Sequence, residues 1–140
     1  MPNEKMLTEK EFKEFIRIVS ISDVNGYTDE GQKLKDRFHS LGKRICKLIA
    51  QDLDLPEGSY DIRCQKGGIA VSGEVILHSE DLYVMFLVGK TALFRSCEGR
   101  KDYSGGLNHY FSYNAFQKDY PSILHEFKKV IDRKKNLVAS

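Results

Sequence analysis

Apolar residues recur at helical spacing in the first third of the chain. Thr8-Glu9-Lys10-Glu11 fits a capping box, in which the Thr8 hydroxyl accepts a hydrogen bond from the Glu11 amide and the Glu11 side chain reaches back. The pattern after it predicts a helix that ends near Ser22, before the turn residues Asp23 to Gly26. Its apolar face is formed by Phe12, Phe15, Ile16 and Val19.

A second and longer helix is predicted after Thr28, which is a good N-cap residue. It ends before Pro56, because proline cannot continue a helix. The apolar seam of this helix consists of Leu34, Phe38, Leu41, Ile45 and Leu48. The seam covers only about two heptads, so packing on a sheet is favoured over a coiled-coil dimer. A homo-oligomer is left open.

After Gly58 the apolar residues alternate with polar ones, which is typical of strands with one buried face. The pattern predicts strands over residues 60–64, 69–77, 82–88 and 91–97, and a short strand over 109–113. Turns are expected at residues 66–68 and 78–81. Gly73 falls inside the second strand, where a bulge is a better explanation than a close approach by a ligand or by backbone.

Pro121 suits the first turn of a last helix, whose apolar stripe includes Leu124 and Phe127. The order of elements predicts a single α+β domain over residues 1–140. We expect two N-terminal helices, an antiparallel meander of four to five strands, and a C-terminal helix packed with the others on one sheet face.

Composition places the chain among globular proteins, with 41% hydrophobic and 30% charged residues. No apolar run reaches the roughly 20 residues of a membrane helix, and the N-terminus has no signal-peptide core. We therefore expect a cytoplasmic protein without membrane contact. Cys46, Cys64 and Cys97 are odd in number and form no C-x2-C pair. This argues against a disulfide framework and a zinc site, and we expect neither metal nor cofactor.

The formal net charge is only +2, but the C-terminal third carries an excess of basic residues. The last helix has a basic face formed by Lys128, Lys129, Arg133, Lys134 and Lys135. This face fits a nucleic-acid-binding surface, and equally a solvated helix face whose cations complement the helix dipole.

The segment over residues 95–110 is the strongest candidate for a binding site. Its glycines, Gly105 and Gly106 among them, allow backbone amides to approach an anion. The predicted ligand-binding residues are Arg95, Arg100, Lys101, Tyr103, Gly105, Gly106, Asn108 and His109. Cations would neutralise a phosphate, the aromatic rings would stack on a base, and Asn108 would read a base edge. The alternative is a structural connection whose Arg and Asp residues pair with each other.

This segment carries a resemblance. The stretch from Arg95 to Gly106, with Asn108, resembles a loop in small uncharacterised bacteriophage and prophage accessory proteins. Residues 68–74 and 82–84 are similar to the same group. The likeness covers about residues 56–114 and extends less clearly to the whole chain. It implies provenance rather than activity: a phage protein that binds a host factor or a defence signal.

Catalysis has little support in the sequence, because the candidate nucleophiles and histidines lie in no known catalytic motif. The leading hypothesis is a non-enzymatic phage-derived binding protein for counter-defence or host takeover. Its 95–110 loop would bind a nucleotide-like anionic ligand or a host protein. The alternatives are an inhibitor of a host enzyme that binds no nucleotide, and a nucleic-acid-binding module using the last helix. Replacing Arg100 and Lys101 by alanine is expected to change stability by only about 0.5 kcal/mol.

Overall fold

The structure is a computed structural model that describes residues 7–21, 24–102 and 104–139, with side chains through Lys135. Helices α1 (Glu9–Val19) and α2 (Asp29–Asp52) precede five strands, and α3 (Tyr113–Lys118) and α4 (Tyr120–Ala139) follow them. The strands are β1 (Tyr60–Gln65), β2 (Glu74–Ser79), β3 (Leu82–Leu87), β4 (Thr91–Ser96) and β5 (His109–Ser112). The predicted α+β class is confirmed.

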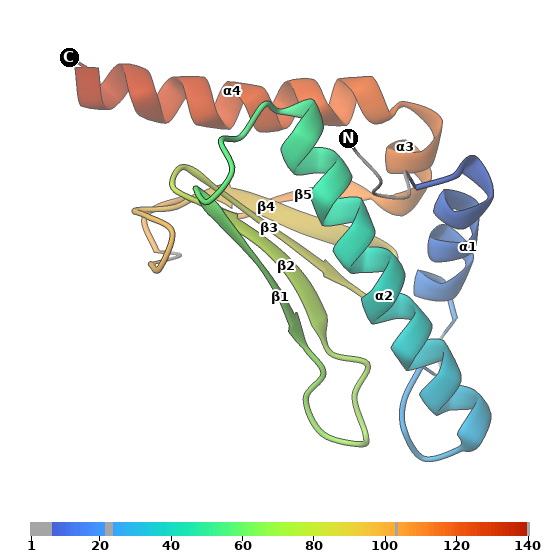
Figure 1. Cartoon of the computed structure of the whole chain (residues 1–140). Coiled ribbons are helices and arrows are strands. Elements are labelled where there is room, and N and C mark those ends of the chain that lie inside the picture. The colour runs from blue at the N-terminus through green and yellow to red at the C-terminus, as the bar shows by residue number, and fades with distance from the viewer. Residues whose placement is uncertain (1–6, 22–23, 103, 140) are drawn as a thin grey trace.

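The five strands form one antiparallel sheet in the order β1-β2-β3-β4-β5, so each strand pairs with its neighbours in sequence. Figure 1 shows the helices gathered on one side of this sheet, with α4 running across one end of the strands. In the described part of the chain no helix covers the opposite face. An antiparallel sheet tolerates this arrangement because its strands alternate between a dry and a wet face.

The core lies between the sheet and the helices. Its largest fully buried side chains include five phenylalanines: Phe15, Phe38, Phe86, Phe116 and Phe127. Phe38, Leu41 and Ile45 of the predicted α2 seam are buried in this core, whereas Leu48 at the end of the seam is only partly buried. A Cβ added at Gly42 would lie 2.8 Å from the side chain of Val75. Glycine at this position lets the helix backbone approach β2 closely.

Both predicted helix caps are present. The Thr8 side chain accepts a hydrogen bond from the Glu11 amide at 3.1 Å, and Glu11 Oε1 accepts one from the Thr8 amide at 3.1 Å. At the second helix, Thr28 Oγ1 accepts from the Gly31 amide at 2.9 Å. These bonds satisfy backbone donors that the helix itself leaves without acceptors.

The prediction was wrong at the start of the second strand. Residues 69–73 belong to the connection between β1 and β2, and the strand begins only at Glu74. Gly73 has φ +81, and a Cβ there would lie 2.3 Å from the Gln65 carbonyl oxygen. The glycine therefore allows a close backbone approach just before the strand. The turn after β2 is also shorter than expected, because His78 and Ser79 are strand residues.

The six-residue helix α3 was not predicted. Ser112 ends β5 and caps α3, accepting a hydrogen bond from the Ala115 amide at 3.0 Å. The first residue of α3, Tyr113, is buried and uses its hydroxyl twice: it accepts from the Leu87 amide at 3.0 Å and donates to the Leu87 carbonyl at 2.5 Å. These bonds fix α3 against the end of β3.

Candidate functional site

The connection between β4 and β5 holds most of the predicted site residues, and it folds into a compact structure of its own. The Glu98 amide donates to the Ser104 carbonyl at 2.9 Å. Gly99 and Asp102 exchange two backbone hydrogen bonds, at 3.2 and 3.1 Å. Backbone groups paired in this way are not directed at a ligand.

Arg100 is anchored to β1. Its guanidinium contacts both carboxylate oxygens of Asp61, at 2.9 and 2.8 Å, and also donates to the Gly58 carbonyl. The Arg100 amide donates to the Glu80 carboxylate at 2.9 Å. The Arg100 hydrogen bond is the main cause that lowers the pKa of Asp61 below its ordinary value. The cation that sequence reasoning assigned to a ligand is thus neutralised within the fold.

Arg95 brings two other predicted residues together. Its guanidinium donates to the Asn108 side-chain oxygen at 3.1 Å and to the Gly106 carbonyl at 2.5 Å. This arrangement closes the connection on β4. Asn108 is therefore held by an arginine from the adjacent strand, a role that favours a structural function for both residues.

The two glycines lie against protein atoms. A Cβ at Gly106 would be 2.5 Å from the Ser96 carbonyl oxygen. Gly105 has φ +103, and a Cβ there would be 2.6 Å from a carboxylate oxygen of Glu98. Both glycines are explained by close contact inside the connection.

Of the remaining predicted residues, Lys101 is exposed, and Tyr103 lies outside the described residues. The His109 ring stacks on Phe94, with ring centroids 5.2 Å apart. His109 therefore points to the helix side of the sheet, whereas the Arg100 contact with Asp61 lies at β1, the opposite edge strand. Among the seven predicted residues that the structure describes, the side chains are not gathered around one point.

His78 on β2 also holds this connection in place. The His78 ring nitrogens lie 2.7 Å from the Gly99 carbonyl oxygen and 3.1 Å from the Arg63 guanidinium. Burial lowers the pKa of His78 below its ordinary value. A neutral ring can accept from Arg63 at Nδ1 while Nε2 donates to Gly99.

A small cleft of about 280 Å³ remains between this connection and α4. It is lined by Gly105 and His109 on one side and by Arg133 and Lys134 on the other, with Glu98 also in the wall. Lys134 Nζ lies 2.7 Å from the Glu80 carbonyl oxygen and 3.1 Å from the Asp81 carboxylate. The basic face of α4 is thus partly used to attach the helix to the turn between β2 and β3.

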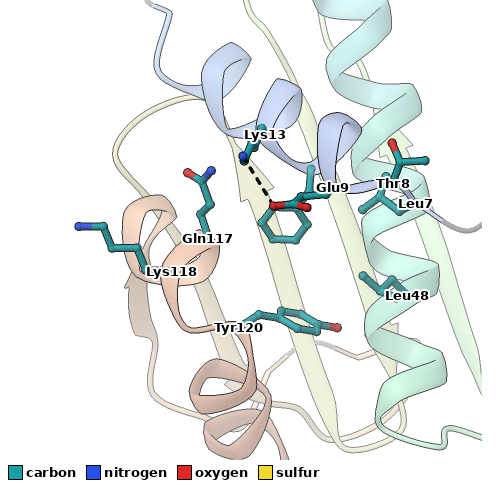
Figure 2. A pocket seen from close by; sticks show the side chains of 9 residues that line it. Leu7, Thr8, Glu9, Lys13, Leu48, Gln117, Lys118 and Tyr120 are labelled. Carbon is teal, nitrogen blue, oxygen red and sulfur yellow. Dashed lines mark ion pairs between the residues drawn. The ribbon is translucent and has the colours of Figure 1, made fainter.

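A larger groove, which the sequence did not reveal, lies between the start of α1, α2 and the α3–α4 junction. Its volume is about 510 Å³. Figure 2 shows Leu7 and Leu48 on one side of it and Gln117 and Lys118 on the other. It is lined by Leu7, Thr8, Glu9, Phe12, Lys13, Leu48, Gln117, Lys118 and Tyr120.

The floor of the groove is apolar and braced. The Phe12 ring stacks on Phe116 with centroids 5.1 Å apart, and it meets Tyr120 edge to face at 6.1 Å. The Tyr120 hydroxyl donates to Asp52 at 2.7 Å, which fixes the ring against α2. Phe12, Leu48 and Tyr120 are only partly buried. Their remaining apolar surface faces the groove.

The rim of the groove is polar and carries lysines. Lys13 Nζ lies 3.6 Å from a Glu9 carboxylate oxygen, an exposed pair that contributes little to stability. Lys118 is exposed on α3 at the opposite rim from Leu48 (Figure 2). An apolar body with an anionic group near Lys118 is the ligand chemistry that fits this distribution.

The thiols are poorly suited to nucleophilic catalysis. Burial raises the pKa of Cys97 to about 11 and also raises the pKa of Cys46 and Cys64. A nucleophilic cysteine needs the opposite shift. Within the described residues, no group of three or more His, Cys, Asp or Glu side chains is placed to hold a metal ion.

Leu7 and Phe12 stand where a hydrophobic staple would lie, just before and within the first turns of α1, and both line the groove. Tyr120, which meets the Phe12 ring edge to face, comes from a part of the chain more than 100 positions away.

None of the helices over residues 7–21, 24–102 and 104–139 combines the length and apolarity required to cross a membrane. Comparison with protein-family models, with curated proteins and with solved structures finds no match to this chain.

Proposed function

We propose that the chain is a non-enzymatic protein-binding module that holds the apolar face of a partner's amphipathic helix in the groove between α1, α2 and the α3–α4 junction. The observation that carries the proposal is the partly exposed floor of Phe12, Leu48 and Tyr120 in a groove of about 510 Å³. Grooves that bind a helix hold its apolar face against apolar walls, with anchors that recur every three or four positions.

The rim favours a particular helix. Lys13 is paired with Glu9 on one rim, and Lys118 stands on the opposite rim, so an acidic residue beside the anchoring side chains would be attracted to Lys118 (Figure 2). A helix whose apolar residues recur every three or four positions presents such a stripe with charges at its border. The resemblance to phage proteins implies that the partner is a host protein, which the chain would inhibit or sequester in the cytoplasm. The free thiols Cys46, Cys64 and Cys97 support a reducing compartment.

A displayed library of amphipathic helical peptides tests this proposal. Enriched peptides should carry apolar anchors next to an acidic residue. Their affinity should fall at least tenfold for Leu48→Asp, which places a charge on the apolar wall. Lys47→Ala, on the neighbouring exposed position of α2, should bind as the parent protein does. Enrichment that survives Leu48→Asp, or a library without any enriched peptide, overturns the proposal.

The anionic-ligand hypothesis keeps one specific observation in its favour: the cleft of about 280 Å³ that contains His109, Gly105 and Arg133. A thermal-shift screen against mono-, di- and cyclic nucleotides and short oligonucleotides tests it. A ligand at about 100 times its dissociation constant stabilises the fold by roughly 2.7 kcal/mol. A ligand-induced rise in the unfolding temperature that is lost in Arg133→Ala and kept in Lys128→Ala would place the ligand in this cleft. A flat response removes this candidate.

A further inference from the structure

The connection between β1 and β2, residues 66–73, lies along the first half of α2 and is called here the latch segment. Lys35 Nζ donates to the Gly68 carbonyl at 3.0 Å. His39 Nε2 lies 2.9 Å from the Ser72 carbonyl oxygen. Figure 1 shows this connection at the same end of the molecule as the segment that joins α1 to α2. The Gly26 amide of that segment donates to the Ile69 carbonyl at 2.8 Å.

The latch segment is held mainly by polar bonds to buried side chains. Lys35 and His39 are only 4% and 3% exposed. The two large apolar residues of the segment, Ile69 and Val71, are 57% and 49% exposed, so they contribute little to its attachment. The hydrogen bonds of Lys35 and His39 are thus the buried side-chain attachments of the segment, beside the Gly26 amide and the exposed pair of Lys66 with Asp36.

The hydrogen bond to Ser72 determines the form of His39. A carbonyl oxygen only accepts, so Nε2 carries the hydrogen and Nδ1 is the bare nitrogen of a neutral ring. Nδ1 is buried and has no hydrogen-bond partner within the described residues. Protonation would create a buried N–H at Nδ1 without an acceptor, which is costly.

Two lysines near the ring also disfavour a positive charge on His39. Lys35 and Asp36 belong to α2, Lys66 comes from the latch segment, and the Cys64 thiol of β1 lies 3.8 Å from the His39 carbonyl oxygen. The Asp36 carboxylate accepts a hydrogen bond from Lys66 Nζ at 3.2 Å. Burial, followed by the charges of Lys66 and Lys35, lowers the pKa of His39 below its ordinary value, against the Ser72 bond and Asp36.

We propose that residues 66–73 form a pH-sensitive latch, which neutral His39 holds closed on α2 and protonation of His39 releases. In the open form His39 is hydrated and regains its ordinary pKa of about 6.5. Below that pH the open form binds a proton that the closed form does not bind. The open fraction then rises by up to tenfold for each pH unit, until the pH reaches the lowered pKa of the closed form. The inference is independent of the groove.

Amide hydrogen exchange measures the opening directly. The Gly26 amide loses its acceptor, the Ile69 carbonyl, when the latch opens. The Gly89 amide donates to the Val19 carbonyl at 2.8 Å and serves as a matched reference outside the latch. After correction for the intrinsic pH dependence of exchange, protection at Gly26 should fall severalfold between pH 7 and 5.5. Protection at Gly89 should change much less. Parallel loss at both amides overturns the proposal.

Two histidine variants sharpen the test. His39→Gln can still donate to the Ser72 carbonyl but cannot titrate, so protection at Gly26 should become independent of pH. His125→Gln removes an exposed histidine on α4 and should keep the wild-type response. In case His39→Gln does not fold, the His39 ring is titrated by NMR in the wild-type protein. A ring that titrates near its ordinary value while Gly26 stays protected also overturns the proposal.

Discussion

The guanidinium of Arg100 and the carboxylate of Asp61 form a two-point ion pair, although 39 residues separate them in the chain. Arg100 lies in the connection after β4, and Asp61 lies on the edge strand β1. The pair therefore fastens this connection to the far side of the sheet. The pair fits the alternative of a structural connection, but the aspartate comes from β1 and not from the connection itself.

Arg100→Ala should lower the thermal midpoint of unfolding measurably, since it breaks the pair and also leaves the Gly58 carbonyl without its Arg100 hydrogen bond. This revises the sequence-based expectation of little effect. Lys101→Ala, at the exposed neighbour, should stay within about 0.5 kcal/mol. The pair is about one-third exposed, so added salt should narrow the difference between the two variants. A double-mutant cycle with Asp61→Asn measures the coupling energy between the two side chains. Additive effects of the two mutations on stability would contradict a stabilising pair.

Gly73 and Gly58 provide a matched pair of glycine tests, because their φ angles are +81 and +83. Alanine at Gly58 meets no atom within 4 Å, so only the left-handed backbone opposes it, at about 1 kcal/mol. Alanine at Gly73 also places its Cβ 2.3 Å from the Gln65 carbonyl oxygen. Urea unfolding should show a clearly larger loss for Gly73→Ala than for Gly58→Ala. Equal losses would mean that the close approach is relieved at no cost.

Glu11 should make stability depend on acid pH. The hydrogen bond from Arg44, followed by that from the Thr8 amide, lowers its pKa from 4.5 to about 2. The folded state therefore holds the proton less tightly than the unfolded state does. The resulting stability is fully present above pH 4.5 and is lost as the pH falls toward 2. Glu11→Gln should flatten this part of the curve, and Glu9→Gln, at an exposed carboxylate paired with Lys13, is the matched control variant.

Phe127 fixes α4 to the sheet. Its ring meets Phe94 edge to face at 5.0 Å and Phe111 at 5.5 Å, and it is fully buried. Phe127→Ala should cost about 3–5 kcal/mol, the usual penalty for a large buried ring. Lys128→Ala, on the exposed neighbour, should be neutral in the same chemical unfolding experiment. A small loss for Phe127→Ala would show that α4 contributes little to the core.

The sequence predicted the elements whose signals are local. Thr8 and Glu11 form the capping box, and Phe38, Leu41 and Ile45 of the α2 seam are buried in the core as their spacing indicated. Ile69 and Val71 were misleading, since their alternation resembles a strand. What excludes them from the strand is the attachment of residues 66–73 to Lys35 and His39, which lie about 30 residues earlier. Helix α3 was missed because six residues are too few to show helical periodicity.

The site was less predictable than the fold. Residues such as Arg95 and Arg100 look the same in sequence whether they meet a phosphate or a carboxylate of the same chain. Their actual partners are Gly106 for Arg95 and Asp61 for Arg100, and only the folded structure brings each arginine into contact with its partner. The groove depends on Phe12 and Tyr120 together, a pairing that no spacing rule connects.

The stacking of Phe12 on Phe116 has a consequence for the order of events during synthesis. The groove takes one wall from α1 and α2 and the other from α3 and α4, so its two halves leave the ribosome at different times. A chain that has completed only the sheet exposes Leu7 and Leu48 but has no second wall. The groove comes into existence only when the last helices dock, and a partner that fits it would therefore recognise finished molecules and ignore nascent ones.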